Sequence, residues 1–61
     1  MTLYVTYAIE DDGTRREIDR HENYAYAKSD LCTWRFANPG VEIILVDHNN
    51  IGTDEYHGDL P

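Results

Sequence analysis

The first segment with a clear pattern, residues 3–9, is mostly apolar and interrupted by one polar residue, Thr6. This segment, Leu-Tyr-Val-Thr-Tyr-Ala-Ile, is rich in β-branched and aromatic residues, which favour strands. The Asp-Gly pair at 12–13 then predicts a tight turn, because it tolerates positive φ. Residues 14–20 follow as a polar return strand whose only apolar residue is Ile18, and such a charged strand suits a sheet edge. Side chains alternate between the faces of a strand, so the first strand has one face with Leu3, Val5, Tyr7 and Ile9 and another with Tyr4, Thr6 and Ala8.

Residues 24–37 follow the period of a helix. Apolar residues recur there every three or four positions, and Asn23 is placed to cap the first turn. The helix is expected to end near Asn38-Pro39-Gly40, because the residue before proline leaves the helical region and glycine permits a left-handed exit. The stripe that would face the sheet consists of Tyr24, Ala27, Leu31 and Trp34.

Residues 41–47, Val-Glu-Ile-Ile-Leu-Val-Asp, form the clearest strand of the sequence. Its two faces carry Val41, Ile43 and Leu45 on one side and Glu42, Ile44 and Val46 on the other. After Asp47 the pattern weakens, and residues 48–52 indicate a turn. We therefore expect residues 48–61 to be a loosely ordered acidic tail that follows a domain at residues 1–47.

The order strand, strand, helix, strand predicts an α+β fold of ββαβ type. A right-handed crossover places the third strand beside the first, which gives a three-stranded antiparallel sheet in the order 2-1-3 with the helix on one face. We expect the face with Leu3, Val5, Tyr7 and Ile9 to meet the helix. The opposite face would then expose an apolar strip, a common feature of contact surfaces, unless the tail covers it. This strip consists of Tyr4, Ala8, Ile44 and Val46.

The chain is strongly acidic, with a net charge of −7 from twelve acidic and five basic residues. This charge disfavours direct contact with nucleic-acid phosphates and favours a partner that has a basic surface. All five basic residues precede residue 36, whereas residues 36–61 contain five acidic residues and neither lysine nor arginine. The C-terminal part of the sequence is therefore its anionic pole.

Little in the sequence indicates catalysis, so we expect no enzyme, no cofactor and no metal site. His21, His48 and His57 lack the spacing of a helical His-x-x-x-His motif, and Cys32 has no basic neighbour in the sequence. A domain with one helix is also not expected to form a deep pocket. The weaker alternative is a metal site built from Asp47, His48 and His57. The single cysteine and the lack of a long apolar segment are typical of a reduced cytoplasmic protein without a membrane partner.

Residues 34–43, Trp-Arg-Phe-Ala-Asn-Pro-Gly-Val-Glu-Ile, resemble a segment of a known family. This is the small early protein with which T7-type bacteriophages inhibit the bacterial RNA polymerase of their host. In that family a tryptophan, a polar residue and an aromatic residue end the helix, and a turn with proline and glycine leads into a hydrophobic-Glu-hydrophobic strand. The length and the order of elements also agree over residues 3–47. The resemblance implies the fold described above, action in the host cytoplasm, and binding at the polymerase jaw that hinders promoter engagement.

The sequence departs from this family in its third strand. The family presents arginines there that contact acidic residues of the polymerase, whereas residues 44–48 of this chain contain no arginine. A contact with polymerase is therefore expected to use Arg15 and Arg16 of the hairpin, or acidic residues that face a basic part of the DNA channel.

Two functions follow as hypotheses. The first is a bacteriophage host-takeover protein that inhibits bacterial RNA polymerase as a stoichiometric binder. The second is an acidic mimic of nucleic acid that blocks a DNA-binding defence enzyme of the host, such as a restriction or CRISPR nuclease. A homodimer that pairs through the bare sheet face is a further alternative. The partner-binding residues that we expect are Tyr4, Glu10, Asp11, Asp12, Arg15, Arg16, Glu17, Ile44, Val46 and Asp47.

Overall fold

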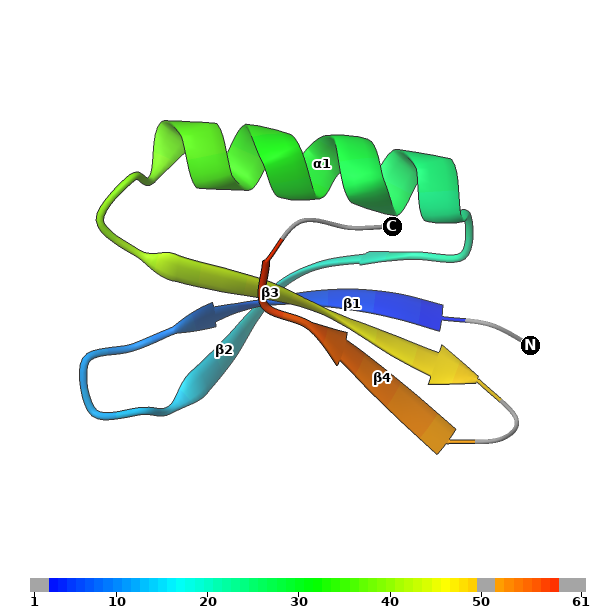
Figure 1. Ribbon diagram of the computed structural model, residues 1–61, viewed down its shortest axis with the longest axis horizontal. Coiled ribbons are helices and arrows are strands. Elements are labelled where there is room, and N and C mark those ends of the chain that lie inside the picture. Colours follow the sequence, from blue (N-terminus) through cyan, green and yellow to red (C-terminus); the bar gives the residue numbers. More distant parts are fainter. Residues whose placement is uncertain (1–2, 50–51, 59–61) are drawn as a thin grey trace.

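A four-stranded antiparallel sheet with one helix packed on one face makes up the computed structural model, which describes residues 3–49 and 52–58 (Figure 1). The elements are β1 (Leu3–Ile9), β2 (Arg15–His21), α1 (Tyr24–Ala37), β3 (Glu42–Asn49) and β4 (Gly52–Tyr56). The strand order is β2-β1-β3-β4, so the α+β class and the predicted order 2-1-3 are confirmed. The predicted number of strands is wrong, because β4 extends the sheet beyond β3.

Strand β4 lies in the segment that the sequence analysis assigned to a loose tail. Strand β3 continues two residues past Asp47, and β4 then pairs with it antiparallel, with Leu45 opposite Tyr56. Gly52 opens β4 with a φ of 152°, a conformation that residues with side chains rarely adopt. Residues 50–51 and 59–61 of the predicted tail lie outside the described residues. The boundary expected at residue 47 is therefore wrong for residues 48–49 and 52–56, which belong to the sheet.

Helix α1 begins and ends on asparagine side chains. The Asn23 side chain accepts hydrogen bonds from the backbone N–H groups of Ala25 at 2.9 Å and Tyr26 at 3.3 Å, so the predicted cap is confirmed. At the other end, both the backbone N–H and the side-chain amide of Asn38 donate to the carbonyl of Trp34. The left-handed exit predicted at Gly40 is wrong, since Gly13 and Gly52 are the described glycines with positive φ. Along the described residues, no helix is both long and apolar enough to cross a membrane.

The face of β1 that meets the helix is the opposite of the one predicted. The β1–β3 register pairs Thr6 with Leu45 and Ala8 with Ile43. Both of these β3 residues belong to the core cluster against α1, as predicted, and directly paired residues share a sheet face. Both faces of β1 are apolar enough to be buried, so its pattern alone does not determine its register. The helix side of β1 carries Tyr4, Thr6 and Ala8, and the far side carries Leu3, Val5, Tyr7 and Ile9.

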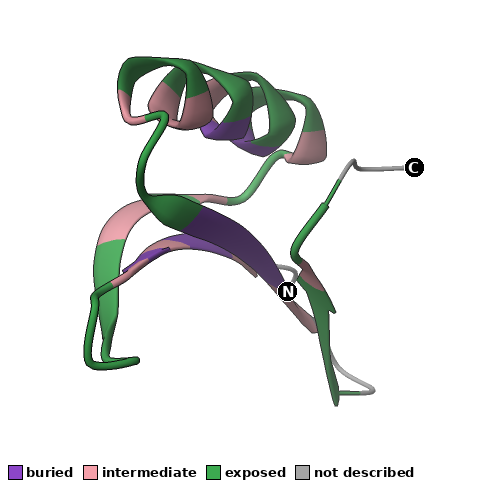
Figure 2. Ribbon diagram, turned by 60° about the vertical axis from the view of Figure 1, so that its left-hand side comes forward, coloured by how far each residue is buried: buried purple, intermediate pink, exposed green. Residues whose placement is uncertain are grey.

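The sheet face turned away from the helix is not bare. Three residues at its centre are almost fully buried, with exposed fractions of 2% for Val5, 0% for Ile44 and 3% for Val46. The sheet arches beneath the helix, so that the β1–β2 turn and β4 descend on either side of its concave face (Figure 2). The edge strands thereby cover the central apolar residues, and the expected exposed strip is wrong. Ala8 is also buried, and Tyr4 is half-buried on the helix side.

Candidate binding surface

An ion pair joins the two edge strands across the concave face. The Arg15 guanidinium of β2 donates two hydrogen bonds to the Glu55 carboxylate of β4, at 2.8 and 2.9 Å. The two strands are separated in the sheet by β1 and β3, so this contact spans both central strands. The pair therefore closes the concave face over its buried apolar residues.

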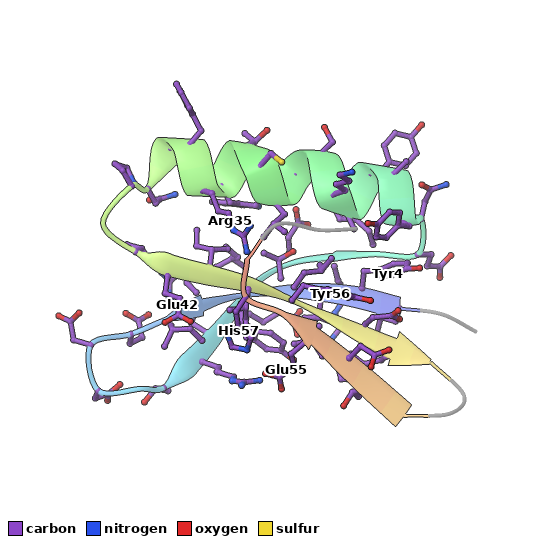
Figure 3. All side chains as sticks on the ribbon, in the orientation of Figure 1. Tyr4, Arg35, Glu42, Glu55, Tyr56 and His57 are labelled. Carbon is purple, nitrogen blue, oxygen red and sulfur yellow. The ribbon has the colours of Figure 1, made fainter. Side chains whose placement is uncertain are left out.

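A histidine extends this ion pair into a network. The two ring nitrogens of His57 lie 3.2 Å from a Glu42 oxygen and 3.1 Å from a Glu55 oxygen. The three side chains are labelled in Figure 3. Arg15 first, and His57 second, hold the pKa of Glu55 down at about 2. Hydrogen bonds with Glu42 and Glu55 raise the pKa of His57. The concave face therefore carries paired charges.

The other arginines near the hairpin are also paired. Arg16 donates to Glu10 at 2.7 Å, and Arg20 donates to both oxygens of Glu17 at 2.8 and 2.9 Å. All of these side chains are exposed, and exposed ion pairs contribute little to stability. Their main consequence is local neutralisation, because the arginines expected to reach an acidic partner already have carboxylates beside them.

The guanidinium of Arg35 hydrogen-bonds to backbone carbonyls of the same chain. The β3–β4 register would place Ile43 opposite Gly58 if the ladder continued past Tyr56. Instead, the guanidinium of Arg35 donates to the Ile43 carbonyl at 2.9 and 3.1 Å and to the Gly58 carbonyl at 2.9 Å. The side chain thus takes the place of strand pairing where β4 ends, and it ties α1 to both segments (Figure 3).

Most of the described acidic residues have no arginine or lysine partner. Eleven of the twelve lie among the described residues, and three of these pair with arginine, which leaves eight without an arginine or lysine contact. Exposed carboxylates among them lie in the β1–β2 turn, before α1, at the start of β3 and on β4. The protein therefore presents anionic groups to solvent, while Arg15, Arg16 and Arg20 are paired with carboxylates of the same chain. The eight residues are Asp11, Asp12, Asp19, Glu22, Asp30, Glu42, Asp47 and Asp54.

The β1–β2 turn is the most defined of these anionic segments. The Glu10 backbone N–H donates to the carbonyl of Thr14 at 2.8 Å, and Gly13 adopts a φ of 88° that favours glycine. The Asp12 carboxylate accepts a hydrogen bond from the Thr14 backbone N–H at 2.9 Å, and the contact with Thr14 lowers the pKa of Asp12. Asp12 is thus held ionised, and Asp11 lies beside it at the exposed tip.

A second cluster of titratable groups lies between β2 and α1. The Nε2 atom of His21 is 3.1 Å from an Asp19 oxygen and 2.6 Å from an Asp30 oxygen. The Trp34 indole N–H donates to the same Asp19 oxygen at 3.2 Å. Burial opposes the charged forms, but these hydrogen bonds outweigh it, so the pKa of Asp19 is lowered and that of His21 is raised. This cluster was not predicted from the sequence. Its one local signal is the Asp-x-His spacing, which places Asp19 and His21 on the same face of a strand.

The structure does not bring together Asp47, His48 and His57, the alternative metal site considered from the sequence. Asp47 pairs with Tyr4 and lies on the helix side of β3, whereas its neighbour His48 faces the other side. His57 contacts Glu42 and Glu55 on the concave face. Among the described residues, the group with metal-ligand proximity is Asp19, His21 and Asp30.

The structure divides the expected partner-binding residues into three groups. The first group belongs to the hairpin: Glu10, Asp11 and Asp12 lie at the β1–β2 turn, and Arg15, Arg16 and Glu17 of β2 are in ion pairs. Ile44 and Val46 are buried, so a partner cannot reach them without opening the sheet. Two residues lie on the helix side: Tyr4 packs against Tyr24 with ring centroids 5.6 Å apart, and Asp47 is half-buried.

A pocket of about 330 Å³ lies between the C-terminal end of α1 and β2. Its wall includes Trp34, Val41 and two charged residues, Arg16 and Glu17, but neither histidine nor cysteine.

Comparison with known proteins adds no relative. No protein-family model matches this chain, and no curated protein and no solved structure is significantly similar to it.

Proposed function

We propose that the protein is a non-enzymatic bacteriophage inhibitor that binds a basic DNA-contacting surface of bacterial RNA polymerase. The observation that carries this proposal is the distribution of charge. The arginines are held in contacts within the chain, and eight described carboxylates have no arginine or lysine partner, although three of them contact a histidine. A surface of this kind is attracted to the cationic grooves that otherwise hold nucleic-acid phosphates.

The mode of contact differs from the one that the resemblance implies. Residues 44–48 lack the arginines of the T7-type family, and Arg15 and Arg16 are already paired with glutamates. Of the two contacts expected from the sequence, these pairs favour the acidic one. We therefore place the contact on the β1–β2 turn, with Asp11 and Asp12 at its tip.

Like charges elsewhere on the sheet support an anionic binding role. Asp47 and Asp54 are directly opposite each other in the β3–β4 ladder, an arrangement that is destabilising by itself. Burial first, and then these two aspartates, raise the pKa of the neighbouring Tyr56. These charges lie outside the β1–β2 turn, so they add to the long-range attraction toward a basic partner rather than to the direct contact.

The same surface chemistry favours a second candidate target. Carboxylates on several elements resemble a series of phosphates, which would fit the DNA groove of a restriction or CRISPR nuclease equally well. The resemblance of residues 34–43 to the polymerase inhibitors is the reason to test polymerase first.

Purified bacterial RNA polymerase, promoter DNA and the full chain provide the test. We expect the protein to reduce transcription stoichiometrically and to be captured with polymerase. The double substitution Asp11→Asn and Asp12→Asn should weaken inhibition several-fold, because it removes both charges from the turn and keeps an acceptor for the Thr14 N–H.

The matched control is the double substitution Glu22→Gln and Asp54→Asn, which changes the net charge from −7 by the same two units outside the turn. It should weaken inhibition less. Failure to capture polymerase, with transcription unaffected, would refute the polymerase proposal. Protection of DNA from a host defence nuclease would then favour the second target.

A further inference from the structure

Three potential ligand atoms converge where β2 faces α1. Asp19 and His21 alternate on β2, so they lie on one face, and their cross-strand partners are Thr6 and Tyr4 of β1. Asp30 reaches the same point from the helix. The ligand atoms all lie within 4.8 Å of one another, and each of the three side chains is half-buried.

The hydrogen bonding of this cluster is incomplete. Both carboxylates approach the same nitrogen, His21 Nε2, at 3.1 and 2.6 Å. One ring nitrogen carries at most one proton, so it cannot donate a well-aligned hydrogen bond to both oxygens. The two carboxylates also repel each other. A cation at this point would satisfy both oxygens and the nitrogen lone pair together.

A buried hydroxyl beside the cluster provides a second observation. Thr6 has an exposed fraction of 0%, and its Oγ1 atom has no hydrogen-bond partner among the described residues. It lies directly opposite Asp19 in the β1–β2 ladder and on the same face. Buried polar groups without a partner are uncommon in folded proteins. A water molecule bound to an ion beside Asp19 would give this hydroxyl its partner.

Trp34 also contacts the cluster, in the way that residues outside the coordination sphere contact metal ligands. Trp34 donates its indole N–H to Asp19 Oδ2 at 3.2 Å and so fixes the orientation of this carboxylate. Hydrogen bonds of this type hold first ligands in position in many metal sites.

We propose that Asp19, His21 and Asp30 bind one divalent transition-metal ion, for which Zn²⁺ is the best fit. One imidazole nitrogen and two carboxylate oxygens are ligands that Zn²⁺ accepts, and water completes a tetrahedral site. Ligand atoms around tetrahedral Zn²⁺ are about 3.3 Å apart. The observed separations of 3.1 and 2.6 Å need only a small movement, which the half-buried Asp30 side chain permits. Mg²⁺ and Ca²⁺ require about six or more oxygen ligands and fit poorly.

Titration of the metal-free full chain with Zn²⁺ tests this site independently of the proposed function. Trp34 is the single tryptophan, so its fluorescence reports on the cluster directly. We expect a saturable change at one equivalent of Zn²⁺ and a rise in the melting temperature. Mg²⁺ at the same concentrations should change neither signal.

Variants locate the ion. Asp30→Asn and His21→Gln should each weaken Zn²⁺ binding at least tenfold, whereas Glu22→Gln, an exposed control next to the cluster, and His57→Gln on the concave face should leave it unchanged. Circular dichroism establishes that each variant is folded, and Asp30→Asn changes a partly exposed helix residue if His21→Gln does not fold. The proposal is overturned if Zn²⁺ leaves the Trp34 fluorescence unchanged, or if Asp30→Asn binds Zn²⁺ as tightly as the original chain.

Discussion

At the ends of β4 and α1, single side chains donate hydrogen bonds to backbone carbonyls. Arg35 satisfies the carbonyls of Ile43 and Gly58 where β4 stops, and Asn38 satisfies the Trp34 carbonyl where α1 stops. Buried and partly buried carbonyls need such partners, because leaving them unpaired costs free energy. The long-range role of Arg35 is not visible in the sequence. Local periodicity identifies the helix that carries Arg35, but not the strand end that it meets.

The Arg15–Glu55–His57 network predicts a pH dependence of stability at the residue scale. Glu55 has its pKa lowered from 4.5 to about 2, so its contribution is present above pH 4.5 and is lost as the pH falls towards 2. His57 has its pKa raised above 6.5, so its contribution is present below pH 6.5 and is lost as the pH rises through the raised value. Both contributions therefore coincide between about pH 4.5 and 6.5.

Melting temperatures of the original chain and of Glu55→Gln, measured from pH 6 down to pH 2, test the network. We expect Glu55→Gln to melt at a lower temperature at pH 5 to 6, because it loses the charged acceptor of Arg15, and the difference should vanish near pH 2. Glu22→Gln, which has no contact in the network, is the control. A difference that stays constant from pH 6 to pH 2 would contradict the assignment.

At the scale of elements, the sequence predicted β1, β2, α1 and β3 but neither the register of β1 nor β4. The periods of two and of three to four residues are strong where only one face is apolar, as in the helix. Strand β1 is apolar on both faces, so either register buries a similar set of residues. Strand β4, Gly-Thr-Asp-Glu-Tyr, has a single apolar residue, and it forms because β3 offers an unpaired edge and because Tyr56 packs against the core. Tertiary contacts decide both features.

Burial of the concave face predicts a large effect for one substitution. Ile44→Ala should lower the free energy of unfolding by about 2–5 kcal/mol, since Ile44 is 0% exposed on the side away from the helix. The matched substitution Val41→Ala, at a residue that is 43% exposed, should cost less than about 1 kcal/mol. Chemical denaturation measures both values. A small and equal cost for the two variants would mean that the face is open, as the sequence analysis expected.

The candidate site was predicted in part, and the reason is again contact between distant segments. The acidic turn at residues 10–12 could be identified from composition and local turn chemistry alone. The buried state of Ile44 and Val46 could not, because it depends on the curvature of the sheet and on the edge strands that cover it. The Asp19–His21–Asp30 cluster likewise requires the packing of α1 on β2. Residues that act locally were therefore found, and those brought together by the fold were missed.

At the scale of the whole molecule, closure of both sheet faces changes what a partner can recognise. The apolar residues at the centre of both sheet faces are covered, so the sheet offers a partner mainly charge, and the large apolar side chains that remain exposed are Tyr26, Phe36 and Val41 among the described residues. Its net charge of −7, with the arginines in internal contacts, gives an attraction that acts before contact and that salt screens. An apolar contact would not show this screening. The two modes of binding therefore differ in their response to ionic strength.

The most direct test is the affinity of the full chain for purified bacterial RNA polymerase as the salt concentration is raised. We predict that the affinity falls steeply with ionic strength and that promoter DNA competes with the protein for the enzyme, because both would occupy the same cationic surface. An affinity that hardly changes with salt, or binding that DNA does not displace, would contradict an anionic mode of recognition.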